Sequence, residues 1–528
     1  MRVRLAAGVA LLSLACSLVS RPLPPTPAPT QVPATRALPT LVPTSTSAPT
    51  PPSEVLPPTP IVDWSDVEPQ REVLLEAFAA DASSFPLATR YWIEAVVRFD
   101  PLQPQAFIDG RERVRFTNPL EHPLDDLVLM LWPNDDQYAA EMQAGPAIID
   151  GQVVTPKPEP RGVGLRYELT TPLPPGETLD LTIPFHIIAS GPIRPQAPKR
   201  FGIAEGMLLA PTFYPLIPRL SSEGEWEALP APPGGDTTNS DIAFYDVRLT
   251  VPDGIAVAAT GRELERVAGA NGTLTVRFAS GPVRDFAFAL GRFVSAEARA
   301  GEVVVRAWVL EAHVAAAEDT ARVAAQAVET FEQLIGAYPY NELDVVDAPG
   351  AFGGIEYPGL VFIGVVGDAW DDIVVVHEVA HQWFYALIGN DQLLEPWLDE
   401  AAASYAESLF FEATGDPRSA TGLLDEDRLI LRSMDETDTP IGLPVSEYGS
   451  EAEYGVYVYL KGALFFDALR NRLGEEGFGA FLQAYFSQHR YGFASAASFQ
   501  SAAEATCGCD LDDLFDLWVY EGGELPLP

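Results

Sequence analysis

The residues best suited to chemistry form a His-Glu-x-x-His motif, made of His377, Glu378 and His381. On a helix, residues four apart lie on one face, so both imidazoles can point at a single metal ion. Glu400 follows the motif after a gap of 18 residues, within residues 397–405, where a second helix could supply a carboxylate. Two imidazoles and one carboxylate suit zinc, and three protein ligands leave a fourth position open, as in catalytic sites. The sequence therefore predicts one zinc ion per chain, held by His377, His381 and Glu400.

Glu378 is the residue best placed to move protons at such a site. A hydrolytic zinc centre needs one group that takes a proton from the attacking water and another that stabilises the oxyanion. Because Glu378 lies inside the motif, we expect it to be the general base that passes the proton to the leaving amine. The alternative is a pair of core histidines on a buried helix with a solvated glutamate. Apolar residues on both sides of the motif predict a buried helix, where a glutamate needs a partner.

The pattern of apolar residues predicts two kinds of structure. From about residue 90 to 310, short runs alternate apolar and polar residues and are divided by Pro, Gly, Asn and Asp, which is typical of a mostly antiparallel β domain. Residues 315–335 have an alanine-rich helical pattern, and helical segments dominate the remainder. We predict an α+β multidomain chain, with an antiparallel β-sheet domain at 61–300, led by a short helix at 72–80, and a mainly helical catalytic domain at 301–528.

The first twenty residues have the features of an export signal. Arg2 and Arg4 precede an apolar run, and residues 13–15 form a small-x-small cleavage site. Cys16 follows directly, as in bacterial lipoproteins, where this cysteine carries a lipid. Two outcomes stay open, a lipid anchor on Cys16 or plain cleavage and secretion. Both predict a location outside the cytoplasm, either secreted or anchored to the cell membrane surface through the N-terminus.

The next segment, residues 21–60, contains 14 prolines among threonine, serine and alanine. This composition favours extended polyproline-type conformations and cannot bury a core. We expect a disordered linker that holds the folded part away from a membrane or cell wall.

The net charge of the chain limits the classes of partner that it can bind. It has 74 acidic and 33 basic residues, for a formal net charge of −41. Such a chain is repelled by nucleic acid and by anionic membrane surfaces. We therefore expect no nucleic-acid partner, and membrane contact only through a lipid on Cys16. The oligomeric state is left open.

Two further cysteines, Cys507 and Cys509, are separated by one glycine. This spacing leaves two states open, because free thiols or an unusually tight bridge could both form. A metal role is disfavoured, since no other cysteine and no nearby histidine completes a site.

Two more motifs complete a resemblance that covers roughly residues 85–525. The sequence Gly-Gly-Ile-Glu-Tyr-Pro-Gly occupies residues 353–359, and Tyr-Leu-Lys-Gly occupies residues 459–462. Together with the zinc motif and its 18-residue gap, their order and spacing resemble the aminopeptidase N-like zinc metallopeptidases, the gluzincin aminopeptidases related to leukotriene hydrolase. The resemblance implies a saddle-like β domain, a thermolysin-like catalytic domain, a zinc cofactor and peptide substrates.

The resemblance also implies roles for single residues. It assigns the zinc ligands and the general base to the same residues that are named above. It further implies that Tyr459, in the Tyr-x-Lys-Gly motif, donates a hydrogen bond to the oxyanion. Tyr454 and Tyr457 lie close in sequence and keep the choice of tyrosine open.

Substrate binding is implied for Glu356, Gly353 and Gly354. In the family this strand runs beside the substrate, and its glutamate pairs with the free α-ammonium, which selects cleavage at the N-terminus. The two glycines leave the backbone free to bond an extended peptide. Two departures weaken the match: Tyr357 replaces the family's asparagine, and residues 212–215 replace a segment that often supplies a second amine ligand. We therefore expect amine recognition to depend on Glu356 alone.

We expect an exported zinc metallopeptidase that removes N-terminal amino acids from peptides by attack of a zinc-bound water, with Glu378 as base. One alternative is a zinc endopeptidase, or a hydrolase of another amide, on the same scaffold. An alternative of another class is a non-catalytic surface binding protein. Its mark would be the loss of a ligand, the base or the tyrosine, and none is lost. No motif identifies the preferred N-terminal residue or the physiological substrate.

Overall fold

The computed structural model describes residues 62–192, 200–232, 235–236, 239–348, 353–364, 372–434, 438–523 and 525. All of them belong to one compact unit, Leu56–Pro528. The expected export signal, Cys16 and the proline-rich linker lie outside the described residues, so they stay predictions. Within the described part of the chain, the structure contains no helix with the length and apolarity needed to cross a membrane.

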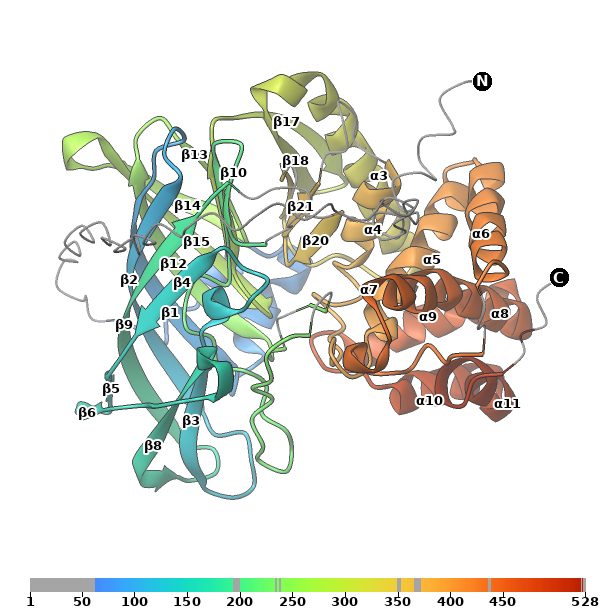
Figure 1. The fold of residues 1–528 in the computed structure, drawn as a ribbon, viewed down its shortest axis with the longest axis horizontal. Helices are drawn as coiled ribbons and strands as arrows, with labels where there is room; N and C mark the ends of the chain where they lie inside the picture. The colour runs from blue at the N-terminus through green and yellow to red at the C-terminus, as the bar shows by residue number, and fades with distance from the viewer. Residues whose placement is uncertain are drawn as a thin grey trace, which may run out of the picture. The chain divides into compact units, whose positions relative to one another are not determined.

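Strands occupy the N-terminal part of the described chain, drawn in blue to green in Figure 1. The largest sheet has nine strands in the order β14-β15-β12-β1-β2-β9-β5-β6, with β4 also paired to β9. Its strand pairs are antiparallel except β1 with β12, which is parallel. The strands are β1 (Thr89–Arg98), β2 (Gln105–Thr117), β4 (Ala140–Ala144), β5 (Ala147–Ile149), β6 (Gln152–Val154), β9 (Thr178–Ser190), β12 (Ala243–Pro252), β14 (Arg262–Ala268) and β15 (Thr273–Val283).

Two smaller sheets complete the N-terminal β region. One has the strand order β3-β8-β7 and the other β10-β11-β16-β13. Their strands are β3 (Leu124–Met130), β7 (Lys157–Pro158), β8 (Gly164–Leu173), β10 (Gly202–Ala204), β11 (Met207–Pro211), β13 (Ala256–Ala259) and β16 (Ala287–Gly291). The period-two pattern seen in the sequence follows burial, because alternate residues along β1 and β9 face the core.

The sequence predicted a short helix at residues 72–80, but the structure has no continuous α-helix there. Helix α2 (Glu68–Arg71) ends before it, and a 3₁₀ segment occupies Glu76–Ser83. Between them the backbone pairs with a distant loop: the Leu75 N–H donates to the Pro339 carbonyl, and Val73 accepts from Asn341. These tertiary hydrogen bonds replace the i→i−4 bonds that a continuous helix would require.

The next sheet along the chain has five strands in the order β17-β18-β19-β21-β20, with both parallel and antiparallel pairs. Helix α3 (Ala317–Leu334) packs on β17 and β18, and α4 (Asp372–Ala380) packs on β20 and β21. Strand β20 is at the edge of this sheet, which matters for the site below. The strands are β17 (Phe293–Ala300), β18 (Val303–Leu310), β19 (Glu342–Asp347), β20 (Gly354–Tyr357) and β21 (Leu360–Ile363).

Helices dominate from α4 onward, drawn in orange to red in Figure 1. They pack around an aromatic cluster that includes Trp397, Phe465 and Phe499. The remaining helices are α5 (Trp397–Ala413), α6 (Pro417–Leu431), α7 (Glu451–Tyr454), α8 (Gly462–Leu473), α9 (Glu475–His489), α10 (Ala496–Cys507) and α11 (Asp512–Phe515). The expected fold class, a β domain followed by a mainly helical part, is confirmed; the boundary at residue 300 stays a prediction.

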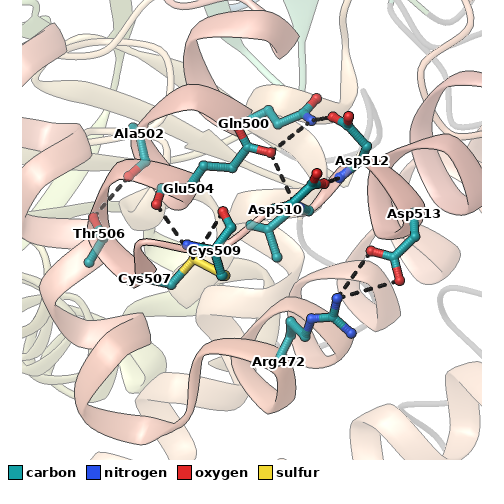
Figure 2. The surroundings of a disulfide bond; sticks show 11 residues. Arg472, Gln500, Ala502, Glu504, Thr506, Cys507, Cys509, Asp510, Asp512 and Asp513 are labelled. Carbon is teal, nitrogen blue, oxygen red and sulfur yellow. Dashed lines mark hydrogen bonds and ion pairs between the residues drawn. A yellow bond between two sulfur atoms is a disulfide. The ribbon is translucent and has the colours of Figure 1, made fainter.

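Cys507 and Cys509 form a disulfide at the end of α10, as Figure 2 shows. Of the two states left open by the sequence, the structure has the tight bridge. Gly508 between them has φ +63°, the left-handed conformation that glycine adopts readily at a helix end. The carboxylate of Glu504 accepts a hydrogen bond from the Leu511 N–H at 3.0 Å and thus joins α10 to the next segment.

Candidate metal centre

The expected zinc ligands meet at one point inside the protein. The Nε2 atoms of His377 and His381 are 3.1 Å apart, and Oε2 of Glu400 is 3.2 Å from each of them. All three residues are buried. With metal–ligand bonds of about 2.0–2.2 Å, two ligand atoms of a tetrahedral site are about 3.3–3.6 Å apart. The three atoms therefore already form, to within a few tenths of an ångström, one face of a zinc coordination tetrahedron.

The protonation of the two rings fits a cation at this point. Nδ1 of His381 is 2.9 Å from the carbonyl oxygen of Phe384, which only accepts, so the ring proton lies on Nδ1. Nδ1 of His377 is likewise 2.8 Å from the carboxylate of Glu407. In each neutral ring, Nε2 then presents a lone pair toward the other Nε2 and toward Glu400. Three converging electron pairs are stable together only around a cation, so the residues fit zinc.

The close approach of these three side chains also shifts their pKa values when no metal is bound. Burial lowers the pKa of His377, but its hydrogen bonds to Glu400 and Glu407 outweigh this and raise it to about 10. Burial raises the pKa of Glu400, yet the histidines bring it well below its usual range. Without metal, protons on the histidines would balance the carboxylates, and a zinc ion would take their place.

Two packed helices hold the three ligands. His377 is in α4, and His381 follows the last residue of α4, with its N–H still 3.3 Å from the His377 carbonyl oxygen. Glu400 is in the first turn of α5, which packs against α4. Gly462 begins α8 beside α5, where a Cβ would come 2.4 Å from the Cβ of Ala401. The glycine of the Tyr-x-Lys-Gly motif therefore lets the segment that carries Tyr459 approach the ligands.

Glu378 lies between the ligand His381 and strand β20, with a carboxylate oxygen within 4.8 Å of a His381 ring nitrogen. Its side chain is buried, and Oε2 has no hydrogen-bond partner among the described residues. Burial raises its pKa to about 8, while the nearby histidines act in the opposite direction. A Cβ on Gly354 would come 2.1 Å from Oε1 of Glu378, so the backbone of β20 passes directly over this carboxylate. Glu378 is thus close to the strand expected to bind substrate, with one oxygen free to take a proton.

Tyr459 is the tyrosine that contacts the ligands. It lies in a π-helical turn, Gly455–Lys461, and its ring stacks on the His377 ring with centroids 5.8 Å apart. Its hydroxyl hydrogen-bonds Glu400; burial, more than this bond, raises its pKa. Tyr454 packs edge-on against Tyr459, and Tyr457 stacks on a different ring, that of Tyr448. Single π turns occur often at functional sites, because they redirect side chains.

Glu356 is in a buried cluster of carboxylates that the sequence did not reveal. The Gln392 side chain donates to Glu356 at 3.1 Å and to Asp399 at 3.0 Å. Burial and then the charge of Asp236 raise the pKa of Glu356 to about 7. Asp236 is ion-paired with Arg200, so the β domain contributes both signs of charge. Of this set, only Asp399 had a signal in the sequence, its place beside Glu400; Gln392, Arg200 and Asp236 converge only in the fold.

The two glycines of the motif differ in their surroundings. A Cβ on Gly353 would meet no atom within 4 Å, which fits a backbone left open for a peptide. At Gly354 a side chain would not fit for a different reason, because the backbone there is in contact with Glu378. Phe213 and Tyr214, in the segment that replaces the family's second amine ligand, are buried in the β domain, where Tyr214 donates to the Tyr245 hydroxyl.

The fold and the site together define a class: a two-part chain whose helical part holds a His-Glu-x-x-His…Glu zinc centre beside an edge strand. Residues 320–518 match the Peptidase family M1 domain. The chain is 30% identical to human aminopeptidase B over 266 residues, which cover 47% of this chain and 40% of that protein. It is 28% identical to aminopeptidase N of Streptomyces lividans over 204 residues, 35% of this chain and 24% of that protein. The chain thus spans less than half of either relative.

Solved structures show the same fold. A crystal structure of the M1 zinc metallopeptidase of Deinococcus radiodurans aligns with a TM-score of 0.64 at 22% identity, covering 84% of this chain and 95% of that one. A mutant of that protein, crystallised with a Tyr-Ser-Ala substrate, aligns equally well at 23% identity. The match of residues 320–518 to the Peptidase family M1 domain, together with the aminopeptidase relatives, confirms the resemblance to the aminopeptidase N-like zinc metallopeptidases.

Proposed function

We propose that this protein is a zinc aminopeptidase that removes N-terminal residues from peptides. The observation that carries the proposal is the position of Glu378, a buried carboxylate between the three ligand atoms and the edge strand β20. A purely structural metal site has no use for a buried glutamate with an oxygen that lacks a partner. Known aminopeptidases among the relatives support the same reading.

The reaction needs one metal ion per chain, held by His377, His381 and Glu400. When bound, zinc polarises the scissile carbonyl and makes water a better nucleophile at neutral pH. Glu378 takes the proton from the attacking water and gives it to the leaving amine. The Tyr459 hydroxyl donates a hydrogen bond to the oxygen on which negative charge develops. The phenol suits this role because its raised pKa keeps the proton on it at neutral pH.

Selection of the N-terminus is assigned to Glu356. An extended peptide can add to β20, the last strand of its sheet, which places its backbone beside Glu378. Glu356 follows two residues after Gly354 on the same strand, so its carboxylate can receive a free α-ammonium. The incoming cation would offset the cost of a buried carboxylate whose pKa is about 7. The buried residues Gln392 and Asp399 fill the space next to Glu356.

The test is hydrolysis of a peptide with a free N-terminus beside its N-acetylated twin, using the zinc-loaded full chain and identifying products by mass. Stepwise loss of N-terminal residues from the free peptide alone would support the proposal. Internal cleavage of both peptides would replace it with the endopeptidase alternative. No cleavage of either would favour the binding-protein alternative. Glu356→Gln should raise KM for the free peptide far more than it lowers kcat, and Glu318→Gln, on the exposed surface of α3, should change neither.

We also propose that the chain acts outside the cytoplasm, either secreted or anchored by a lipid on Cys16. The support is the pattern of residues 1–20 alone. Mass measurement of the mature N-terminus from the native host would decide, since a diacylglycerol on Cys16 and an unmodified cleaved end differ in mass. An N-terminus at Met1 would contradict both forms of the proposal.

A further inference from the structure

The loop that follows the zinc motif contains a tyrosine in an unusual backbone conformation. Tyr385 is buried and has φ +129°, a positive value that residues other than glycine rarely adopt. A bulky residue keeps such a conformation only where its surroundings hold it there, and strain of this kind is common beside functional sites. Because Tyr385 is four residues beyond His381, the groups that hold it can act on a metal ligand.

Three hydrogen bonds hold Tyr385. Its hydroxyl donates to the Asp285 carboxylate, and its carbonyl oxygen accepts from Nε of Arg284 at 2.7 Å. Its N–H donates to the Ile388 carbonyl oxygen at 2.9 Å, within the same loop. Burial, and then the charge of Asp285, raises the pKa of Tyr385, so the hydroxyl keeps the proton that it donates. Arg284 and Asp285 are neighbours between β15 and β16, so the β domain supplies two of these three bonds.

The bond from the Tyr385 N–H also determines where the preceding carbonyl points. In a trans peptide the N–H and C=O groups point in opposite directions. The Phe384 carbonyl therefore points away from Ile388, and it accepts from Nδ1 of His381 at 2.9 Å. That bond fixes the imidazole ring so that Nε2 faces the other two ligands. Contacts thus lead from Asp285 through the peptide group before Tyr385 to His381.

The β domain lies close enough to this loop to restrict its backbone. A Cβ on Gly389 would come 2.2 Å from Cζ of Arg284, so the guanidinium lies directly against the loop. Arg284 and Asp285 are both buried, which is costly for charged groups that lack partners. Each has a partner on Tyr385, one on the backbone and one on the ring. The tyrosine is therefore held at two points by the β domain.

We propose that Tyr385, held by Asp285, is a positioning residue for the zinc ligand His381. The bond to Asp285 keeps the strained backbone in place, the backbone orients the Phe384 carbonyl, and that carbonyl holds the imidazole ring. The β domain would in this way contribute to metal binding without supplying a ligand. The inference rests on the zinc centre of the proposed function.

The experiment measures the zinc affinity of the full chain by competition with a zinc chelator. Tyr385→Phe removes only the hydroxyl and should weaken zinc binding by about 10-fold, the lower end of the effect of groups that orient metal ligands. Asp285→Ala should weaken it by a similar factor, and the double variant by no more, because all three lose the same bond. Asp285→Asn should keep most of the affinity, since its amide oxygen still accepts from the hydroxyl.

Tyr340→Phe is the matched control. Tyr340 is also buried, and its hydroxyl donates to the carbonyl oxygen of Pro282, three residues before Asp285. Because Tyr340 lies outside the loop after the zinc motif, this variant should bind zinc as wild type. The visible spectrum of the cobalt-substituted protein is a second measurement, since cobalt suits the same ligands and its absorption depends on their geometry. The spectrum should change in Tyr385→Phe and not in Tyr340→Phe.

Several outcomes would overturn the inference. Unchanged zinc affinity and cobalt spectrum in Tyr385→Phe would do so while leaving the zinc centre in place. Equal losses of affinity in Tyr385→Phe and Tyr340→Phe would show that the effect follows general stability, which thermal midpoints of the metal-free proteins measure separately. Additive losses in the double variant would mean that Asp285 acts by another route. Wild type that binds no zinc at His381 would overturn the proposed function as well, and the wild-type titration separates this result from the others.

Discussion

At the scale of single residues, the metal centre depends on groups that are not ligands. Glu407 and the Phe384 carbonyl each accept the Nδ1 proton of a ligand histidine and so turn both Nε2 lone pairs inward. Such outer contacts fix ring orientation and increase ligand basicity. Glu407 is 30 residues from His377, so its role is visible only in the structure.

Glu378→Gln should keep the metal but lower kcat by at least about 100-fold, because general-base assistance is typically worth about 100- to 10,000-fold. Glutamine has nearly the same shape, so the contact with Gly354 is preserved. Zinc content by atomic absorption and kcat on a free peptide measure the two effects. Near-normal turnover with full zinc would contradict the assignment of the base.

Tyr459→Phe should lower kcat by about 10- to 1,000-fold with little change in KM, since a donor to the developing oxyanion acts mainly in the transition state. Tyr454→Phe is the matched control, because Tyr454 packs against Tyr459 without stacking on a ligand histidine. Steady-state kinetics on one peptide compares them. A larger loss in Tyr454→Phe would transfer the role to that residue.

At the scale of elements, strand β20 and helix α4 approach so closely that only glycine fits between them. Gly354→Ala should push the strand or Glu378 aside, since the new Cβ would come 2.1 Å from Oε1. We expect a loss of activity of at least about 100-fold, because displacement of a catalytic group by about 1 Å has effects of this size. Gly353→Ala meets no protein atom within 4 Å, so it should fold as wild type and lose less activity than Gly354→Ala, as measured by thermal unfolding and kinetics. Equal activity of both variants would show that the strand adapts freely.

Strand β2 carries a carboxyl group into the core of the β domain. Glu112 is fully buried, and neither of its oxygens has a hydrogen-bond partner among the described residues. Burial raises its pKa well above the usual range. The folded protein therefore holds a proton that the unfolded chain releases, so this group makes stability decrease as pH rises above its unfolded pKa of about 4.3.

Glu112→Gln should accordingly stabilise the protein at pH 8 and have little effect near pH 4, because glutamine is neutral at both. The measurement is the thermal midpoint of wild type and variant across this range. Glu168→Gln, an exposed position on β8, should follow wild type. A variant that loses stability with pH as steeply as wild type would show that Glu112 is ionised in the folded state.

At the scale of the whole folded unit, Arg284 ties the β domain to the helical part. It follows β15, is buried, and donates to the carbonyl oxygens of Tyr385, Ser240 and Gly492. Its guanidinium also lies over the Phe493 ring, 4.5 Å from the centroid. Tyr385 is four residues beyond His381, so this contact links the β domain to the loop after the zinc motif.

Arg284→Met should lower the free energy of unfolding by about 3 kcal/mol or more, because two buried carbonyls and one partly buried carbonyl lose a charged donor. Urea denaturation monitored by fluorescence measures this change. Arg472→Met removes an exposed arginine paired with Asp513 and should cost less than about 1 kcal/mol. Equal losses in the two variants would mean that Arg284 is not a structural link.

The sequence by itself predicted the fold class and the three residues that meet at the candidate metal centre, because both depend on local regularities. Histidines four apart share a helix face, and period-two patterning marks strands whatever their partners. Only the tertiary structure decided which groups stand around those ligands. Gln392, Asp236 and Arg200 reach Glu356 from distant segments, and Gly354 is fixed by a contact with α4. Such contacts arise from packing between elements, and no spacing within one segment encodes them.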